Sequence, residues 1–262
     1  MSQPKKIYKY EPMSIQALRN LKSQAIYFNS PLNFNDPFDC NTDVKLRVPY
    51  EDEVPYILEF LREELEGHPK LSEIENQSTG ELAAMGMVLA ENMLKERANK
   101  VFKSKGVCCF SETNDNLLMW SHYASSAKGF CLEFDSSNEP FDKLLPVEYV
   151  DNPPELDYQK VFSIDSMYFL NALFCTKSSH WSNEKEWRVL HNEVNKVYRY
   201  SKESLTGVYF GPEIDQDITE IICLIIQGQN PEAKFYKGAR SSDSYKVTFN
   251  EVNYTPHVSA NA

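Results

Sequence analysis

The chain has 262 residues, of which 42% are hydrophobic and 25% charged, as expected of a globular protein with a substantial core. Its formal net charge is −11 and it has no long Lys/Arg run, which argues against a protein that binds nucleic acid chiefly by neutralising backbone phosphates. No run approaches membrane-spanning length, and the start of the chain has no apolar signal core. We therefore expect a soluble, cytoplasmic protein without a membrane partner.

The cysteines and histidines give no pattern of a metal site. The six cysteines, at positions 40, 108, 109, 131, 175 and 223, include no Cys-x-x-Cys pair and mostly lie in apolar runs. We interpret them as buried free thiols in a reducing compartment. The histidines, at positions 68, 122, 180, 191 and 257, show no paired spacing on a helix, so no metal is expected.

The first half of the chain predicts strands and helices in alternation. Residues 6–10 alternate like a strand, and Ser14 then caps a helix. Further strands are predicted at 25–28, 106–110 and 129–134, and further helices at 51–67, 80–103 and 116–124. The polar segment 69–79 connects two of these helices. We expect residues 51–103 to form a helical insert or lid.

The second half continues the pattern and completes a mixed fold. Strands are predicted at 143–150, 186–191, 206–210 and 245–254, and helices at 158–175 and 216–226. The expected fold class is α+β, with a mixed, mostly antiparallel sheet core and flanking helices. Residues 1–262 are expected to form one domain that carries the helical insert.

A turn-rich loop at residues 33–39 is the first candidate site. Asn and Asp bond their own backbone readily, and Pro37 prevents a continuing strand, so the loop is predicted to be rigid. A well-made turn explains the loop completely, and we give this interpretation more weight. The functional alternative is that Asn35 and Asp36 direct their amide and carboxylate groups into a pocket.

The second candidate follows the strand that ends at Phe110. Ser111 and Thr113 place hydroxyls where α/β proteins bind ligands, although simple capping of the next helix by Asn114 or Asp115 also explains the segment. The pair Ser121-His122 is not predicted to be a nucleophile and its base, because adjacent helical residues point about 100° apart. His122 is more typical of a structural histidine.

The third candidate is the segment from Trp181 to Arg188, which combines two carboxylates, two indoles and a guanidinium. Carboxylates beside bulky aromatics are partly desolvated, and such groups cluster at functional sites. A strand with outward glutamates would have much the same sequence. Arg188 is the expected local ion-pair partner of Glu186, since residues two apart on a strand share a face. Lys177 is either a solvated lysine or a cation that holds a phosphate or carboxylate.

These segments together resemble a bacterial family known as domain of unknown function 2971. The resemblance spans roughly residues 6–226 and is carried in order by Tyr8-Lys9-Tyr10, Asn35-Asp36-Pro37-Phe38, Cys109-Phe110-Ser111-Glu112, Trp120-Ser121-His122-Tyr123 and Glu184-Lys185-Glu186-Trp187-Arg188. It implies a bacterial, intracellular, single-domain α+β protein, often encoded in mobile or defence-related neighbourhoods, whose motifs line one cleft. The family label itself names no activity.

A more distant resemblance is to ADP-ribosyltransferases, and it implies an NAD-dependent effector in defence or toxin biology. That superfamily has an NAD-positioning residue on a first strand, an aromatic-Ser-x-Thr-like strand in the middle and a late Glu-x-Glu. Here Lys9 stands in for the Arg or His of the first strand. The resemblance implies Glu186 and Glu184 as catalytic residues. Residues implied to bind NAD as a substrate are Tyr8, Lys9, Tyr10, Asn35, Asp36, Ser111, Thr113, Trp120, His122, Tyr123, Lys177, Trp181 and Arg188.

Two other functions remain open on the sequence. One is a non-catalytic sensor of a small ligand, peptide or phage component, whose aromatic cleft is formed by Trp120, His122, Tyr123, Trp181 and Trp187. The other is a metal-dependent nucleic-acid effector with Lys177, Lys185 and Arg188 on phosphates, against which the net charge counts. The expected partners are thus a small-molecule nucleotide and a protein or nucleic-acid acceptor.

Overall fold

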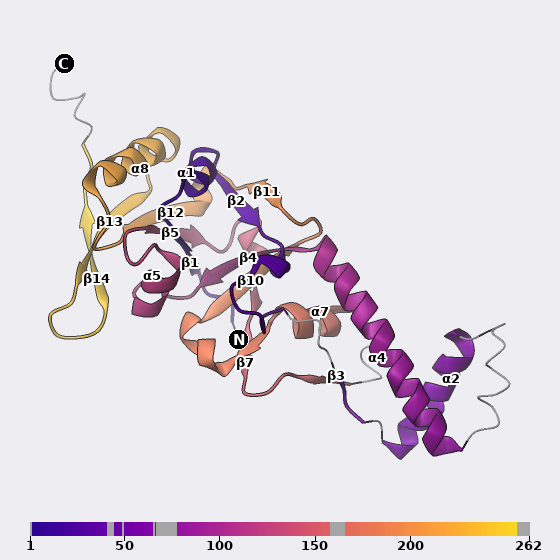
Figure 1. The fold of residues 1–262 in the computed structure, drawn as a ribbon. Coiled ribbons are helices and arrows are strands. Elements are labelled where there is room, and N and C mark those ends of the chain that lie inside the picture. Colours follow the sequence, from indigo (N-terminus) through magenta and orange to yellow (C-terminus); the bar gives the residue numbers. More distant parts are fainter. Residues whose placement is uncertain are drawn as a thin grey trace. The chain divides into compact units, whose positions relative to one another are not determined.

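The computed structural model describes residues 2–40, 45–48, 50–64, 66, 78–157 and 166–255 (Figure 1). In chain order the elements are β1 (Lys6–Glu11), α1 (Ile15–Lys22), β2 (Ala25–Phe28), η1 (Pro31–Asn33), β3 (Lys45–Leu46), η2 (Glu51–Glu53), α2 (Val54–Glu64), α4 (Thr79–Ser104), β4 (Gly106–Ser111), α5 (Leu117–Tyr123), β5 (Phe130–Asp135), η3 (Phe141–Lys143), β6 (Leu145–Pro146), β7 (Glu148–Val150), β8 (Glu155–Leu156), α7 (Ser166–Phe174), β9 (Thr176–Ser178), η4 (Ser179–Glu184), β10 (Glu186–His191), β11 (Lys196–Arg199), η5 (Lys202–Ser204), β12 (Leu205–Phe210), α8 (Gln216–Gln229), β13 (Lys234–Arg240) and β14 (Val247–Val252).

The chain forms two compact units, each built from segments that are distant in sequence. Unit 1 contains residues 1–33, 105–147 and 180–262, and unit 2 contains residues 34–104 and 148–179. The predicted helical insert falls in unit 2, which also includes a later segment of the chain. The single domain with an insert at 51–103 stays a prediction.

Unit 1 is organised around an eight-stranded sheet in the order β14-β13-β12-β5-β1-β4-β10-β6. All its neighbouring strands are antiparallel except β12 and β13, which run parallel. A separate antiparallel pair joins β2 to β11. The structure therefore confirms the α+β class with a mixed, mostly antiparallel sheet.

Helices cover both faces of this sheet (Figure 1). On one face, α1 and α8 bury the larger hydrophobic cluster, to which Phe110, Phe134 and Ile222 belong. Ser14 caps α1, as the sequence predicts, and its side chain accepts a hydrogen bond from Ala17 N. On the other face, which we call the α5 face, Trp120 of α5 packs in a smaller cluster with tyrosines of the sheet. The sheet thus has one apolar face and one aromatic, partly polar face.

Unit 2 contains α2, α4 and α7 and two short parallel strand pairs, β3 with β8 and β7 with β9. Ring contacts join α4 to α7, since the centroids of Phe102 and Phe174 lie 5.0 Å apart and the Arg97 guanidinium lies 4.9 Å from the Phe169 centroid. Phe102, Phe169 and Phe174 are all buried, so this contact is the apolar interior of the unit.

One predicted strand, at 143–150, is two separate strands. The chain changes hydrogen-bonding partner at Val147, whose N–H donates to Glu186 O at 3.0 Å, whereas the N–H of Glu148 donates to Cys175 O at 2.7 Å. Strand β6 therefore pairs with β10, and β7 pairs with β9. An alternating pattern does not reveal such a change, because both halves remain extended.

Other boundaries differ from the prediction in smaller ways. The helix predicted from residue 51 begins with the 3-10 turn η2, and the closing strand is shorter than predicted. Strands β11 and β13 were not predicted. Residues 69–77 of the predicted connector and 158–165 of the predicted helix lie outside the described residues. Within the described part of the chain, no helix is long and apolar enough to span a bilayer.

Candidate functional site

A row of polar residues crosses the α5 face of the sheet. Tyr8 of β1 pairs with Ser111 of β4, and Ser111 pairs with Glu186 of β10. On the far side of β1, Tyr8 pairs with Glu133 of β5. Directly paired residues on antiparallel strands project from the same face, so these four side chains form one line across four strands. We call it the polar row.

Glu186 lies at one end of the polar row in a two-bond contact with Arg188. Arg188 Nε donates to Glu186 Oε1 at 2.7 Å, and Arg188 Nη2 donates to Oε2 at 2.9 Å. The Arg188 side chain is 0% exposed and that of Glu186 is 6% exposed. The ion pair expected from the spacing is therefore formed. Both oxygens of Glu186 are already hydrogen-bonded to a planar donor, which fixes the orientation of the carboxylate.

Ser111, in the middle of the row, ties the end of β4 to the segment before β10. Its hydroxyl donates to Glu184 O at 2.7 Å and accepts from Thr113 N at 3.2 Å. The Glu184 side chain is buried, and its Oε1 accepts a hydrogen bond of 2.6 Å from the hydroxyl of Tyr123 on α5. Between the two glutamates, Lys185 adopts a left-handed backbone conformation with φ of 46°. The predicted middle strand and late Glu-x-Glu thus meet in space.

Glu133, at the other end of the row, is a buried carboxylate that the sequence analysis missed. It accepts hydrogen bonds from Lys6 Nζ, Thr206 Oγ1 and the Tyr209 hydroxyl, each at 2.7 Å, and from the Tyr8 hydroxyl at 3.1 Å. Burial raises the pKa of Glu133, but the hydrogen bonds from Lys6, Thr206 and Tyr209 outweigh it and the pKa lies below its ordinary value. A charged residue inside the apolar strand 130–134 is the sequence signal that identifies it.

The hydroxyl groups of Tyr8 and Tyr10 both form hydrogen bonds within the protein. Burial, followed by the neighbouring Glu133 carboxylate, raises the pKa of Tyr8. The Tyr10 hydroxyl donates to Thr113 O at 2.9 Å, and its ring meets that of Trp120 edge-on with centroids 5.2 Å apart. The Trp120 indole N–H donates to Asn114 O at 2.6 Å. These contacts connect β1, α5 and the loop after β4 into one aromatic cluster.

Lys9 of the implied NAD site and Trp187 of the predicted aromatic cleft lie on the opposite face of the sheet. Lys9 alternates with Tyr8 and Tyr10 along β1, so its side chain projects to the α1 and α8 side, where its Nζ lies 3.4 Å from Glu11 Oε1. Burial lowers the pKa of Lys9, but the Glu11 carboxylate together with the Cys108 and Cys109 thiols outweighs burial, so the net shift is upward. Lys9 therefore does not share a pocket with Tyr8 and Tyr10. Trp187 likewise lies in the larger hydrophobic cluster, and its N–H donates to Glu112 Oε1 at 2.7 Å.

The five aromatic residues of the predicted cleft consequently do not form one surface. Trp120 and Trp187 are buried on opposite faces of the sheet. The other three do gather where α5 meets η4, because the His122 ring lies 6.2 Å from the Trp181 ring and 6.3 Å from that of Tyr123. His122 is exposed, and the other two rings are partly exposed. This group lies next to Glu184, which accepts the Tyr123 hydrogen bond.

The remaining candidates lie in unit 2. Asn35 is exposed, whereas Asp36 is buried and its Oδ1 accepts from Phe38 N at 2.9 Å, which is the rigid turn that the sequence predicts. Lys177 Nζ lies 3.3 Å from Asp39 Oδ2, and both side chains are almost completely buried. Lys177 is therefore not a solvated lysine. It holds the predicted loop through a carboxylate, the second of the two roles considered for it.

Two of the three cations predicted to contact phosphates in a nucleic-acid effector form ion pairs inside the protein. Lys177 and Arg188 are both buried against carboxylates, and Lys185 is exposed. Within the described part of the chain, no group of three or more His, Cys, Asp or Glu side chains is arranged to hold a metal ion. No disulfide joins the six cysteines, which all belong to that part.

A family model with the description "Protein of unknown function (DUF2971)" matches residues 119–189. This part of the chain, about a quarter of its length, is therefore similar to that family. The matched DUF2971 segment runs from α5 to β10, so it includes Tyr123, Glu184, Glu186 and Arg188. The motifs of β1, the loop at 33–39 and β4 lie outside the match. Neither a curated protein nor a solved structure gives a significant match to the chain.

Proposed function

We propose that the protein is an NAD-dependent ADP-ribosyl-transfer enzyme whose site is built on β1, β4 and β10. The observation that carries the proposal is the polar row. Tyr8, Ser111 and Glu186 come from the three motifs that resemble those of ADP-ribosyltransferases, and they are direct register partners on adjacent strands. These motifs are distant along the chain and resemble those of one enzyme class. Their meeting on one face of the sheet therefore supports a common site.

In the proposed reaction, the bond between the ribose C1′ and the nicotinamide nitrogen breaks, and its electron pair leaves with neutral nicotinamide. The C1′ then gains a bond to the oxygen of water or of an acceptor, and the proton of that oxygen passes to a base. Positive charge develops on the ribose during this step, and a fixed carboxylate stabilises it. We assign that role to Glu186, which Arg188 orients, and the role of base to Glu184.

Support for these roles comes from the fixed positions of both glutamates. Arg188 holds both oxygens of Glu186, and Tyr123 holds one oxygen of Glu184. The Ser111 hydroxyl connects the two motifs through Glu184 O, which makes it a positioning residue rather than a group that touches the substrate. Preorganised groups of this kind stabilise a transition state without moving during the reaction.

The test is release of nicotinamide from NAD by the full-length chain, followed by chromatography, with and without bacterial lysate as a source of acceptors. Glu184→Gln and Glu186→Gln are expected to reduce the rate at least about a hundredfold, as removal of a general base or a charge-stabilising group typically does. The matched control is Glu112→Gln, which neutralises an exposed carboxylate next to Ser111 and keeps an oxygen to accept the Trp187 N–H.

Stability must be measured on every variant because Glu186 is an ion-pair partner. Rates are compared at a temperature where circular dichroism shows each variant to be folded. Loss of nicotinamide release in folded Glu184→Gln and Glu186→Gln, with normal release in Glu112→Gln, supports the proposal. Absence of nicotinamide release by the folded wild-type chain in both conditions overturns it.

A second candidate function, a small-ligand sensor without catalysis, is favoured by one observation. His122, Tyr123 and Trp181 form a partly exposed aromatic group beside a buried carboxylate, and such combinations are common in ligand sites. A sensor binds without turnover, so a ligand raises the melting temperature by mass action while no product appears. Trp181→Ala would then abolish the shift, and the exposed Ser182→Ala is its control.

A further inference from the structure

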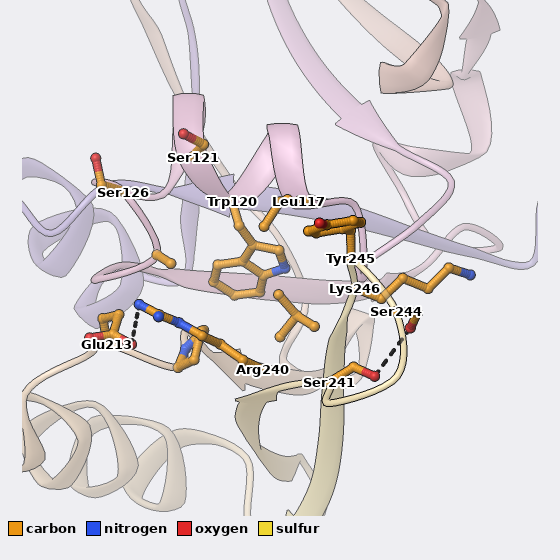
Figure 2. Close-up of a pocket in the computed structure, with 13 residues that line it drawn as sticks. Leu117, Trp120, Ser121, Ser126, Glu213, Arg240, Ser241, Ser244, Tyr245 and Lys246 are labelled. Carbon is orange, nitrogen blue, oxygen red and sulfur yellow. Dashed lines mark hydrogen bonds and ion pairs between the residues drawn. The ribbon is translucent and has the colours of Figure 1, made fainter.

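A concave pocket lies beside α5, entirely within unit 1, and no residue of the polar row lines it (Figure 2). It has a volume of about 470 Å³, is open to solvent, and is bordered by α5, the turn after α5, the turn before α8 and the loop between β13 and β14. That volume is within the range of small-molecule sites. His122, the next residue of α5, is not among the residues that line this pocket.

The pocket is built by an unusual turn. Ser125, Ser126 and Ala127 are three consecutive non-glycine residues with positive φ, of 50°, 55° and 66°. Such backbone conformations are costly and persist where the surroundings fix them. Here the N–H of Ala127 donates to Trp120 O at 2.9 Å, and Ala127 O accepts from Glu213 N at 3.1 Å. The turn therefore positions both the end of α5 and Glu213 at the pocket.

The lining of the pocket is mainly apolar and aromatic. The Trp120 indole lies at its centre in Figure 2, with Leu117 beside it. Trp120 and Val247 are buried, whereas the Tyr245 side chain on the rim is 94% exposed. An exposed aromatic ring at a loop tip beside an apolar pocket is well placed to cover a flat ligand. Serine hydroxyls at 121, 126, 241 and 244 add hydrogen-bonding groups around this apolar centre.

Two cations border the pocket on a chain whose net charge is −11. Arg240 is 77% exposed and lies 2.9 Å from Glu213 Oε1, and Lys246 is 65% exposed and lies 3.6 Å from Asp115 Oδ2. Exposed ion pairs contribute little free energy, so an anionic ligand can replace either carboxylate at low cost. Figure 2 shows the Arg240 side chain, below Trp120 in this view, extending towards Glu213, so its planar donor group lies at the border of the pocket.

We propose that this pocket binds a nucleoside monophosphate. The base would stack on the exposed Tyr245 ring above the apolar floor around the buried Trp120, the ribose hydroxyls would meet the serines, and the phosphate would replace Glu213 on Arg240. A guanidinium recognises phosphate with paired hydrogen bonds, and aromatic side chains stack on any base. The site is separate from the polar row, so the inference does not depend on the proposed NAD chemistry.

The experiment is isothermal titration of the full-length chain with adenosine, guanosine, cytidine and uridine 5′-monophosphates, and with adenosine, ribose 5-phosphate and inorganic phosphate as partial ligands. At least one monophosphate is expected to bind at least about tenfold more tightly than the partial ligands, because each of these lacks one half of the recognition. Absence of binding by all four monophosphates, or equal binding of inorganic phosphate, overturns the proposal.

Four exposed variants locate the binding. Arg240→Gln is expected to weaken it about tenfold, and Glu213→Gln to tighten it several-fold, because the carboxylate competes for the same guanidinium. The matched controls are Lys234→Gln and Glu251→Gln, which break a surface ion pair of 3.1 Å that joins β13 to β14 outside the pocket. These controls should leave binding unchanged. If Arg240→Gln has no effect, or Glu213→Gln weakens binding, the pocket is not the site.

Glu184→Gln separates this proposal from the NAD hypothesis. Monophosphate binding at the pocket should persist in that variant, because Glu184 does not line the pocket. Loss of binding in Glu184→Gln but not in Arg240→Gln would assign the nucleotide to the polar-row side of α5 and overturn the pocket proposal. Nicotinamide release tests only the NAD proposal. If no nicotinamide is released, the titration still decides whether the pocket binds a nucleoside monophosphate.

Discussion

Arg188 and Glu186, two positions apart on β10, form a buried ion pair with two hydrogen bonds of 2.7 and 2.9 Å. A guanidinium and a carboxylate removed from water each lose several kcal/mol of hydration, and the pair is tolerated because each compensates the other. This contact links the candidate chemistry of Glu186 to the stability of the sheet. A substitution of Glu186 is therefore expected to change the stability of the fold as well as the proposed activity.

We expect Glu186→Gln to lower the free energy of unfolding by about 3–5 kcal/mol, since it leaves the Arg188 charge buried without a compensating charge. Urea denaturation at pH 7 measures the change. The control Glu193→Gln breaks an exposed pair with Lys196 and should cost less than about 1 kcal/mol. In the double variant Glu186→Gln, Arg188→Met, part of the loss should be recovered. A Glu186→Gln chain as stable as wild type would contradict this account of the pair.

Glu133 gives a prediction on pH. Its pKa in the folded protein lies below its ordinary value of 4.5, so the ionised form stabilises the fold above that pH, and the contribution is lost as the pH falls through the folded pKa. Wild type should therefore exceed Glu133→Gln in stability at pH 7, and the difference should shrink below about pH 4.5. Urea midpoints at pH 7, 5, 4 and 3 test this. A difference that is constant over the series would show that Glu133 does not titrate as described.

Ser111 is predicted to act through two hydrogen bonds rather than as an exposed ligand group. Ser111→Ala removes the donor to Glu184 O and the acceptor for Thr113 N in a buried position, which should cost about 1–3 kcal/mol of unfolding free energy. Ser121→Ala, an exposed serine of α5, should change stability by less than about 0.5 kcal/mol. Equal stabilities of the two variants would refute the connecting role of Ser111.

The strands that carry the candidate motifs can be predicted from sequence, β1 because its residues alternate and β4 because it is a short apolar run. The pairing of Glu186 with Arg188 also followed from spacing alone. The faces of Lys9 and Trp187 can also be predicted from alternation, because the two neighbours of each residue along its strand project from the opposite face. A strand motif places every second residue on the other side of the sheet.

Other features depend on contacts that no local pattern contains. Strand β13 includes Gly238, which interrupts the apolar pattern, and the glycine is required because a Cβ there would lie 2.6 Å from Phe210 O on β12. The division of residues 143–150 between two strands depends on partners near residues 175 and 186. The left-handed turn at 125–127 contains no glycine, so the sequence does not predict it, and it is maintained by long-range hydrogen bonds.

The turn before α8 gives the last prediction. A Cβ on Gly211 would lie 2.2 Å from Ala127 O, and that oxygen is fixed because it accepts a hydrogen bond from Glu213 N. Gly211→Ala should therefore force the two turns apart and lower the free energy of unfolding by about 1–3 kcal/mol, the usual cost of overpacking. Gly228→Ala is the matched control, because a Cβ at this position of α8 meets nothing within 4 Å. That variant should be stabilised by about 0.5–1 kcal/mol, since alanine favours a helix over glycine. Urea denaturation measures the free energy of unfolding of both variants. Equal stabilities would disprove the close approach of Ala127 to Gly211.

The Gly211→Ala variant should also lose nucleotide binding at the pocket, because Glu213 and Ala127 both line it.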